Sequence, residues 1–275
     1  MNAYFQITRP VNVLIGGLSI FIGAFIAGSI QPIQNVALAV LSGMLIAAAA
    51  NTINDYYDVA IDRINKPYRP IPSGKITEKT AWIYAMIMFV IGTGLSILIN
   101  NKALAIAVFA WVVLYCYSAK LKRTVLWGNL AVSFMTAFAF IYGGVAVNRL
   151  NEAIIPAVFS FLFHLGREII KDIEDREGDS ADHAVTLPIR YGVRPALWVT
   201  MFVFILLIGL TIMPFVMGIF GVPYLWVVIL GVDTVLVFVI FSMWKTPVPK
   251  NLGRLSTLLK MDMLVGLIAI YVGRF

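Results

Sequence analysis

The chain contains two groups of three aspartates with the same spacing, D-x-x-D-x-x-x-D. The first triplet is Asp55, Asp58 and Asp62, and the second triplet is Asp172, Asp175 and Asp179. Together the two triplets hold six of the 14 acidic residues in the chain. Offsets of three and four residues bring side chains to one face of a helix, so each triplet predicts carboxylates that share a face. Like charges at this separation repel, and an uncompensated triplet would destabilise its helix.

Bound divalent cations are the simplest compensation, and a set of ligands made only of oxygen atoms suits Mg²⁺. We therefore expect two Mg²⁺ sites that face each other across a cavity and bind a phosphate-bearing ligand. Basic residues beside both triplets support an anionic ligand, because a diphosphate needs Lys or Arg on the oxygens that the metal leaves free. These residues are Lys66 and Arg69 after the first triplet, and Lys171 before the second.

The alternative interpretation of either triplet is a solvated helix end with ordinary acid–base pairs, which contribute little to stability. The equal spacing of the triplets and their prediction to the same side of a membrane argue against this alternative. A third basic group, Lys120, Lys122 and Arg123, closes a predicted helix in the segment YCYSAKLKR. It either binds phosphate or anchors the end of that helix, and Tyr117 beside it binds substrate or is an interfacial aromatic. For Asp233, within a predicted span, a structural role is favoured.

The composition indicates a polytopic membrane protein. Apolar residues make up 60% of the chain and charged residues only 13%, far from the average of soluble proteins. The net charge of +7 does not indicate nucleic-acid binding, because the basic residues lie between predicted spans, where topology and anionic ligands explain them. The single Cys116 excludes an internal disulfide and a cysteine-based metal site.

Apolar stretches of about 20 residues, enough to cross the hydrocarbon core, predict an all-α protein with nine transmembrane helices. The predicted ranges are residues 11–29, 34–54, 80–99, 102–119, 126–147, 152–171, 195–219, 222–243 and 256–273. With the N-terminus inside, all of the 21 lysine and arginine residues except Lys102, Arg149 and Arg274 lie on the inner side. This distribution predicts a cytoplasmic N-terminus and places both triplets on the cytoplasmic side of the cell membrane.

The motifs NDYYDVAIDRINKPYRPIPSG, YSAKLKR and KDIEDREGD resemble those of the UbiA-type intramembrane prenyltransferases, and the resemblance covers essentially the whole chain. It implies a single domain over residues 1–275, with nine helices around a central cavity and two cytoplasmic caps from the loops after the second and sixth helices. It also implies Mg²⁺-dependent transfer of a prenyl group from a prenyl diphosphate.

The resemblance assigns roles to individual residues. The residues implied to be catalytic are Asn54, Asp58, Asp62, Asp172, Asp175 and Asp179, and the implied metal ligands are Asp55, Asp58, Asp62, Asp175 and Asp179. The resemblance implies that Lys66, Arg69 and either Lys120 or Lys122 bind the diphosphate or the acceptor, with Lys171 beside the second triplet. Further candidates for substrate binding are Arg9, Asn12, Tyr117 and Arg123.

Within the family, the opening ITRPVNVLIGGLSIFIGAFIAG resembles that of archaeal members that act in ether-lipid biosynthesis. They attach a geranylgeranyl group from geranylgeranyl diphosphate to geranylgeranylglyceryl phosphate, a lipid-phosphate acceptor. Two alternatives stay open: a family member that uses 4-hydroxybenzoate or a naphthoate in quinone biosynthesis, and a transporter of cations or metabolites. Transporters place charged sites near the bilayer midplane, whereas the triplets are predicted at one membrane face. A non-catalytic scaffold is the third and least favoured interpretation.

Overall fold

The computed structural model describes residues 2–181 and 184–274, and over this part of the chain it contains helices, turns and loops but no strand. It divides into two compact units, which are described separately. The first unit is Met1–Lys122 with Phe138–Ala153, and the second is Arg123–Ala137 with Ile154–Phe275. Helix α7 (Trp127–Ala146) contributes its first half to the second unit and its second half to the first.

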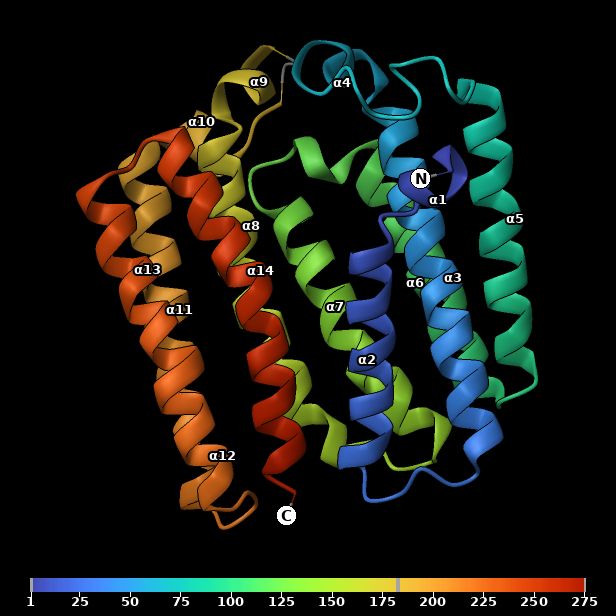
Figure 1. Ribbon diagram of the computed structural model, residues 1–275, viewed down its shortest axis with the longest axis vertical. Coiled ribbons are helices and arrows are strands. Elements are labelled where there is room, and N and C mark those ends of the chain that lie inside the picture. The colour runs from blue at the N-terminus through green and yellow to red at the C-terminus, as the bar shows by residue number, and fades with distance from the viewer. Residues whose placement is uncertain (1, 182–183, 275) are drawn as a thin grey trace. The chain divides into compact units, whose positions relative to one another are not determined.

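The first unit is a helical bundle in which the long helix α3 packs against α2, α5 and α6 (Figure 1). Its helices are α1 (Ala3–Ile7), α2 (Pro10–Ile26), α3 (Ile33–Tyr57), α4 (Val59–Asn65), α5 (Glu78–Ile97) and α6 (Asn101–Ala119), with the short helices η1 (Leu121–Arg123) and η2 (Asn151–Ala153). Ile53 of α3 is fully buried in the core. The ring of Phe89 in the same core stacks on that of Trp111, with 5.3 Å between the ring centroids.

Two glycines let α2 approach α7 closely within the first unit. A Cβ atom on Gly143 would lie 1.9 Å from the carbonyl oxygen of Ile20, and one on Gly23 would lie 2.2 Å from that of Phe140. Contacts of this length with the backbone exclude any larger residue. Small residues commonly allow such packing between membrane helices.

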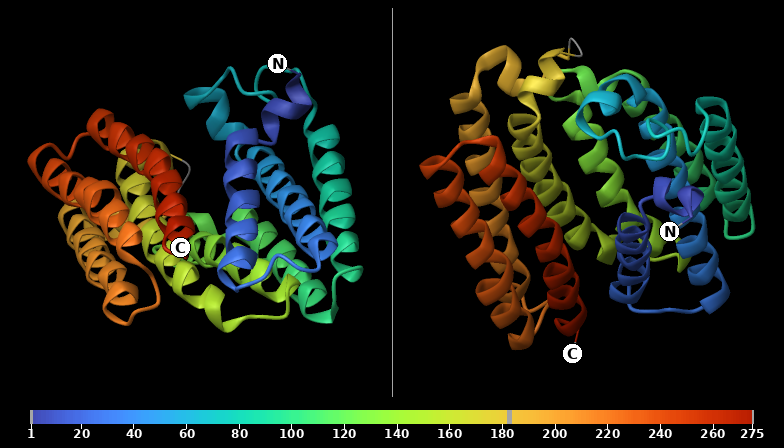
Figure 2. Two further views of the ribbon diagram at one scale, coloured as in Figure 1. Left: turned by 60° about the horizontal axis from the view of Figure 1, so that its bottom comes forward. Right: turned by 45° about the horizontal axis from the view of Figure 1, so that its top comes forward.

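The second unit is a bundle in which α8 packs against α11 and α14. Its helices after α7 are α8 (Ile154–Glu174), α9 (Arg176–Ala181), α10 (Leu187–Tyr191), α11 (Val193–Val216), α12 (Val222–Val227), the π-helix η3 (Val228–Asp233), α13 (Thr234–Lys245) and α14 (Pro249–Val272). Both views in Figure 2 show α11, α13 and α14 side by side. At the contact of α8 with α11, a Cβ on Gly166 would lie 2.2 Å from the ring of Phe204.

A helix occupies each range that the sequence predicts, and the chain is a multi-pass membrane protein. Among the described residues, seven helices are long and apolar enough to cross a membrane, counting α12, η3 and α13 as one. Helix α2 is apolar but has 17 residues. Helix α8 is not among the seven; its last turns carry charged residues, Arg167, Glu168, Lys171, Asp172 and Glu174. Nine spans therefore stay a prediction.

Several predicted helix ends are displaced by a few residues or more, and one predicted helix is interrupted. Helix α3 continues to Tyr57 instead of ending at residue 54, so Asp55 lies within it. The last helix begins at Pro249, seven residues before the predicted start at 256, because Pro at the first helical position is pre-organised for a helix. The predicted helix 222–243 is interrupted by η3.

Candidate active site

The first triplet lies where α3 gives way to α4. Asp58 closes α3 and begins α4, with φ −94° and ψ 3°, so the three aspartates do not lie on one unbroken helix. The hydrogen bonds to the fourth preceding residue nevertheless continue, with 3.0 Å from the Asp58 nitrogen to the Asn54 oxygen and 2.8 Å from the Asp62 nitrogen to the Asp58 oxygen. Asn54, Asp58 and Asp62 therefore still follow one another turn by turn, as the spacing predicts.

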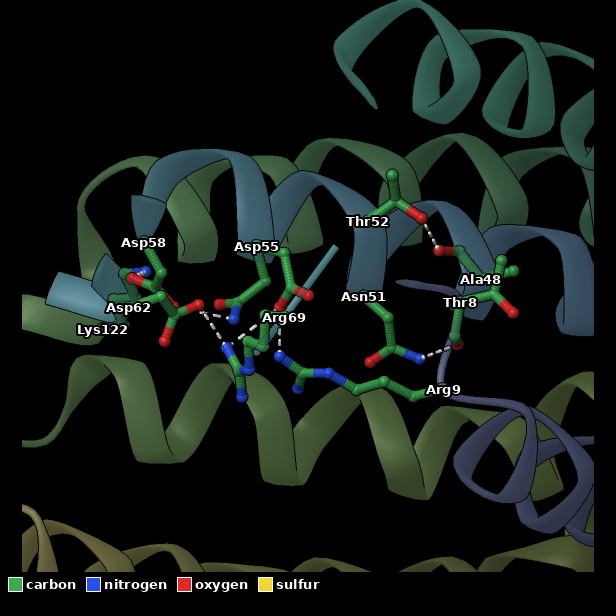
Figure 3. A network of polar contacts seen from close by, with 11 residues as sticks. Thr8, Arg9, Ala48, Asn51, Thr52, Asp55, Asp58, Asp62, Arg69 and Lys122 are labelled. Carbon is green, nitrogen blue, oxygen red and sulfur yellow. Dashed lines mark hydrogen bonds and ion pairs between the residues drawn. The ribbon is translucent and has the colours of Figure 1, made fainter. Parts of the chain in front are cut away.

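Asp55 and Asp62 are buried, with 3% and 4% of their surface exposed, and they share one arginine. Arg69 Nη1 lies 3.1 Å from Asp55 Oδ1 and 2.5 Å from Asp62 Oδ2, and Arg9 Nη2 donates a second hydrogen bond to Asp55 Oδ1 (Figure 3). Asp55 and Asp62 thus lie within reach of the same guanidinium group. A buried carboxylate is costly unless it is paired, and here each is.

Asp58 has its own partners. Its Oδ2 accepts a hydrogen bond of 2.9 Å from Asn54 Nδ2, and its Oδ1 forms an ion pair with Lys122 Nζ. Three carboxylates and three basic side chains thus form one network. From the sequence we expected bound cations to compensate the negative charge of this triplet. In the structure, basic side chains from distant segments compensate it, which the sequence-based expectation did not foresee.

The backbone around both arginines is held in place. Arg9 has a left-handed conformation, φ 54°, at the junction of α1 and α2, and Asn51 Nδ2 of α3 donates a 2.8 Å hydrogen bond to the Thr8 carbonyl beside it (Figure 3). Arg69 follows α4 in a segment anchored by buried Ile71, which packs with Ile7, Ile76 and Ala81. The predicted cap over residues 55–79 is thus an ordered part of the first unit.

Burial and charge shift the protonation of this network. Burial raises the pKa of Asp62, and the attraction of Arg69 only partly opposes this. Burial disfavours the charged form of Arg9, but the three carboxylates outweigh it, Asp55 most, and the pKa of Arg9 is raised. Arg9 therefore stays charged, whereas Asp62 depends on a nearby cation to stay ionised.

The second triplet spans the end of α8 and the start of α9. Asp172 Oδ2 accepts a 2.8 Å hydrogen bond from Asn129 Nδ2 of α7. Asp175 lies between the two helices and is exposed, and the Asp179 nitrogen donates a 2.9 Å hydrogen bond to its carbonyl. As in the first triplet, the middle aspartate lies between two helices. The predicted cap over residues 172–194 contains α9 and α10, with residues 182–183 outside the described part.

Lys171 is held by a buried acid. Its Nζ lies 3.0 Å from Glu168 Oε2, and Glu168 is only 7% exposed. Arg167 Nη1 lies 3.0 Å from Glu168 Oε1, and its Nε donates a 3.1 Å hydrogen bond to the Ser256 carbonyl of α14. The basic side chain predicted to bind phosphate therefore has a defined position.

Sequence reasoning missed Asn51, Asn129 and Glu168. Asn51 and Asn129 act through contacts 43 residues away along the chain, for which the sequence carries no signal. Glu168 had a signal, since it is an acid within a predicted span and three residues before Lys171.

The remaining predicted substrate-binding residues are Asn12, Lys66, Tyr117, Lys120 and Arg123. Asn12 and Lys120 are exposed and Lys66 is half-buried. The carbonyl of Arg123 accepts a 2.9 Å hydrogen bond from the Val185 nitrogen within the second unit. Tyr117 is half-buried near the end of α6. Substrate contacts of these five residues stay predictions.

The donor chemistry fits Mg²⁺. Within the described ranges, no three acidic, histidine or cysteine side chains converge into a group that could hold a metal ion alone. Mg²⁺ does not need such a group, because it keeps several waters and is usually bound by one or two carboxylates together with substrate phosphates. The oxygen donors at the end of α3 meet that requirement.

Comparison with known proteins places this geometry in context. The chain matches the model of the UbiA prenyltransferase family over residues 17–258. The digeranylgeranylglyceryl phosphate synthase of Methanopyrus kandleri is 38% identical over 269 residues, which cover 98% of either chain. The synthase of the same name from Thermococcus gammatolerans is 36% identical and covers 99% of this chain and 98% of its own.

Solved structures are also similar. A structure described as giving insight into digeranylgeranylglyceryl phosphate synthase in membranes has a TM-score of 0.81 at 34% identity, covering 99% of this chain and 97% of its own. A UbiA homologue from Archaeoglobus fulgidus bound to GPP and Mg²⁺ has a TM-score of 0.73 at 20% identity, covering 98% of this chain and all of its own. This second likeness concerns the fold alone.

Proposed function

The chain belongs to the UbiA prenyltransferase family, and on that basis we propose that it transfers a geranylgeranyl group from geranylgeranyl diphosphate to the hydroxyl group of geranylgeranylglyceryl phosphate. The product is digeranylgeranylglyceryl phosphate, a core lipid of archaeal ether-lipid biosynthesis. Full-length similarity to relatives named for this reaction supports the choice of acceptor. The proposal is that residues 1–275 act as one domain in this reaction.

The observation that carries the chemistry is the network at the end of α3, where Arg9 and Arg69 meet Asp55 and Lys122 meets Asp58. A prenyl diphosphate bound beside these carboxylates has guanidinium and ammonium donors within reach of its oxygens. Arginine suits this role because its planar fork matches phosphate oxygens.

When bound, Mg²⁺ neutralises charge on the leaving diphosphate, and Asp55, Asp58 and Asp62 are the residues of this network that would hold it. Arg9, Arg69 and Lys122 stabilise the same developing charge through hydrogen bonds. The bond between the prenyl C1 and the diphosphate oxygen breaks, and its electron pair leaves with the diphosphate. The acceptor hydroxyl oxygen forms the new ether bond to C1, and its proton passes to an oxygen of the departing diphosphate.

The second triplet supplies further oxygen donors. Asp175 is exposed, and Asp172 is held by Asn129. We propose that this triplet, with Lys171, binds the same diphosphate. A spin-label distance between Arg63 and Arg176, both exposed neighbours of the triplets, tests this proposal. A separation too large for both triplets to reach one diphosphate would refute it.

The cytoplasmic orientation of the N-terminus and of both predicted caps, together with nine spans, belongs to the same proposal. The distribution of basic residues supports it. The chain has one cysteine, Cys116, so single cysteines placed in a Cys116→Ala background report orientation cleanly. Labelling of position 68 from the outside of intact cells would contradict the proposal.

The decisive experiment is product analysis by mass spectrometry. Purified protein receives Mg²⁺, geranylgeranyl diphosphate and, in separate reactions, geranylgeranylglyceryl phosphate, 4-hydroxybenzoate or a naphthoate. Digeranylgeranylglyceryl phosphate from the first reaction alone is expected. An aromatic product would instead show a quinone-pathway prenyltransferase, and substrate uptake into proteoliposomes without diphosphate release would show a transporter.

A further inference from the structure

Asn51 lies on α3 one turn before Asp55, so both side chains lie on the same face of the helix. Asn51 has no part in the proposed reaction so far. Its Nδ2 donates a 2.8 Å hydrogen bond to the carbonyl of Thr8, and the next residue, Arg9, reaches Asp55 through its side chain. Two successive residues of the N-terminal segment are thus tied to two positions of α3 that lie one turn apart (Figure 3).

The junction between α1 and α2 depends on such support. Arg9 precedes Pro10, and a residue before proline is disfavoured in the right-handed helical conformation, so α1 does not continue into α2. Arg9 instead has φ 54° and ψ 67°, a left-handed conformation that is costly for a residue with a side chain and persists only where surrounding contacts hold it. The hydrogen bond from Asn51 holds the peptide group between Thr8 and Arg9.

The packing of α1 does not replace this hydrogen bond. Ile7 is fully buried and packs in a cluster with Ile71 and Ile76, which places α1 on the segment that follows α4. Apolar contacts are not directional, so they do not orient the carbonyl of Thr8. The directional contact at the junction is the hydrogen bond from Asn51.

Arg9 also has hydrogen-bond donors to offer a ligand. A guanidinium group has five N–H donors, and the ion pair with Asp55 uses one nitrogen of Arg9, Nη2. Over the described part of the chain, the side chain of Arg9 makes no second hydrogen bond. It is 31% exposed, whereas the side chain of Arg69 is 18% exposed. A planar group that is fixed at one nitrogen presents its other donors in a defined direction, which suits phosphate oxygens.

We propose that Asn51 is a positioning residue for the diphosphate of the prenyl substrate, and that it acts through Arg9. Its hydrogen bond to the Thr8 carbonyl fixes the direction in which the Arg9 side chain leaves the backbone. The contact with Asp55 then sets the guanidinium group so that its remaining donors meet diphosphate oxygens. This inference rests on the proposed function, because it requires that a diphosphate bind beside the first triplet.

Binding of inorganic pyrophosphate in the presence of Mg²⁺, measured by isothermal titration calorimetry on the full chain in detergent, tests the proposal. Asn51→Leu keeps the size of the side chain and removes the donor. It is expected to raise the Kd about tenfold, the effect of losing a charge-assisted hydrogen bond from Arg9. Circular dichroism shows whether the variant is folded, and Asn51→Ala replaces it if the leucine prevents folding.

Thr52→Val is the matched control for this measurement. Thr52 is the next residue of α3, and its hydroxyl group donates a 2.9 Å hydrogen bond to the carbonyl of Ala48 within the same helix (Figure 3). The substitution therefore removes a buried hydrogen bond to a carbonyl without removing a tie to the N-terminal segment. Its Kd for pyrophosphate is expected to equal that of the wild type.

The double variant Asn51→Leu with Arg9→Gln shows whether the effect passes through Arg9. Its Kd is expected to equal that of Arg9→Gln alone, because a guanidinium group that is absent cannot be misplaced. In the transfer reaction, Asn51→Leu is expected to raise KM for geranylgeranyl diphosphate and to leave KM for the acceptor unchanged. A merely structural role would lower kcat through loss of folded protein and leave both KM values unchanged.

The proposal is overturned if Asn51→Leu binds pyrophosphate as the wild type does, or if its effect adds fully to that of Arg9→Gln. A wild-type protein that binds no pyrophosphate in the presence of Mg²⁺ would instead refute the proposed function, and this inference with it.

Discussion

Replacing Arg69 by glutamine would show how much the ion pairs of the first triplet contribute to the stability of the fold. Arg69 joins Asp55 and Asp62, whose side chains are 4% and 5% exposed, through contacts of 3.1 and 2.5 Å. Arg9 still pairs with Asp55 in the variant. Asp62 is therefore the carboxylate that loses its ion-pair partner.

Removing one partner of a buried ion pair typically costs about 3–5 kcal/mol. The side chain of Arg69 is 18% exposed, so some solvent reaches the pair and a loss of about 3 kcal/mol in the free energy of unfolding is expected. Arg63→Gln is the matched control, because Arg63 belongs to the same segment and pairs with Glu78 at 3.2 Å with both side chains largely exposed. Its expected loss is below about 1 kcal/mol.

The pH dependence of the stability of Arg69→Gln identifies Asp62 as the carboxylate that has lost its partner. Burial already raises the pKa of Asp62, and loss of Arg69 raises it further. A carboxyl group with a raised folded-state pKa contributes stability while it is protonated, and this contribution is lost as the pH rises through that pKa. Arg69→Gln should therefore recover much of its loss at mildly acidic pH, and Asp62→Asn in the same chain should recover it at neutral pH.

The assay is equilibrium unfolding of the purified protein in detergent, with circular dichroism as the signal. A double-mutant cycle of Arg69→Gln and Asp62→Asn gives the coupling between the two side chains. Equal losses for Arg63→Gln and Arg69→Gln, or a loss that Asp62→Asn does not relieve, would refute the reasoning.

The remaining predictions concern catalysis. Asp58→Ala and Asp175→Ala are expected to abolish prenyl transfer while the protein stays folded and membrane-inserted. Product analysis at saturating Mg²⁺ measures the remaining transfer, and retention of most of the activity would contradict the proposed roles. Lys122→Gln should raise KM for the prenyl diphosphate, by about tenfold for a lost charged hydrogen bond, and an unchanged KM would count against its contact with the diphosphate. Glu168→Gln should reduce kcat/KM by freeing Lys171, with partial rescue by Glu168→Asp, and equal effects of both variants would indicate a purely structural acid.

The sequence was sufficient to predict the long apolar helices and to single out both triplets as candidate site residues. Helices of this chain follow from long apolar stretches, which are local features of the sequence. The triplets are likewise local, and the hydrogen bonds that link Asn54, Asp58 and Asp62 follow their spacing. Substrate roles for Arg69 and Lys122 came from the family resemblance; these roles, and that of Arg9, stay predictions.

The partners of the carboxylates could not be predicted from the sequence. Arg9 is 46 residues from Asp55, and Lys122 is 64 residues from Asp58. Such pairs form only because the packing of α2 and α6 against α3 brings their ends together, and helical periodicity contains no information about that packing. The π-helix before Asp233 was missed for a similar reason, since its apolar sequence fits a regular helix equally well.

The balance of charges in the first triplet explains why a metal is needed for the proposed reaction. Three carboxylates are matched by Arg9, Arg69 and Lys122, so the network has no surplus positive charge to offer a diphosphate. A diphosphate that took these donors would leave Asp55 and Asp62 buried and unpaired, at a cost comparable to that of Arg69→Gln. Divalent cations remove this conflict, because they compensate carboxylates and phosphates at once. The same ion pairs that stabilise the fold thus make substrate binding depend on Mg²⁺.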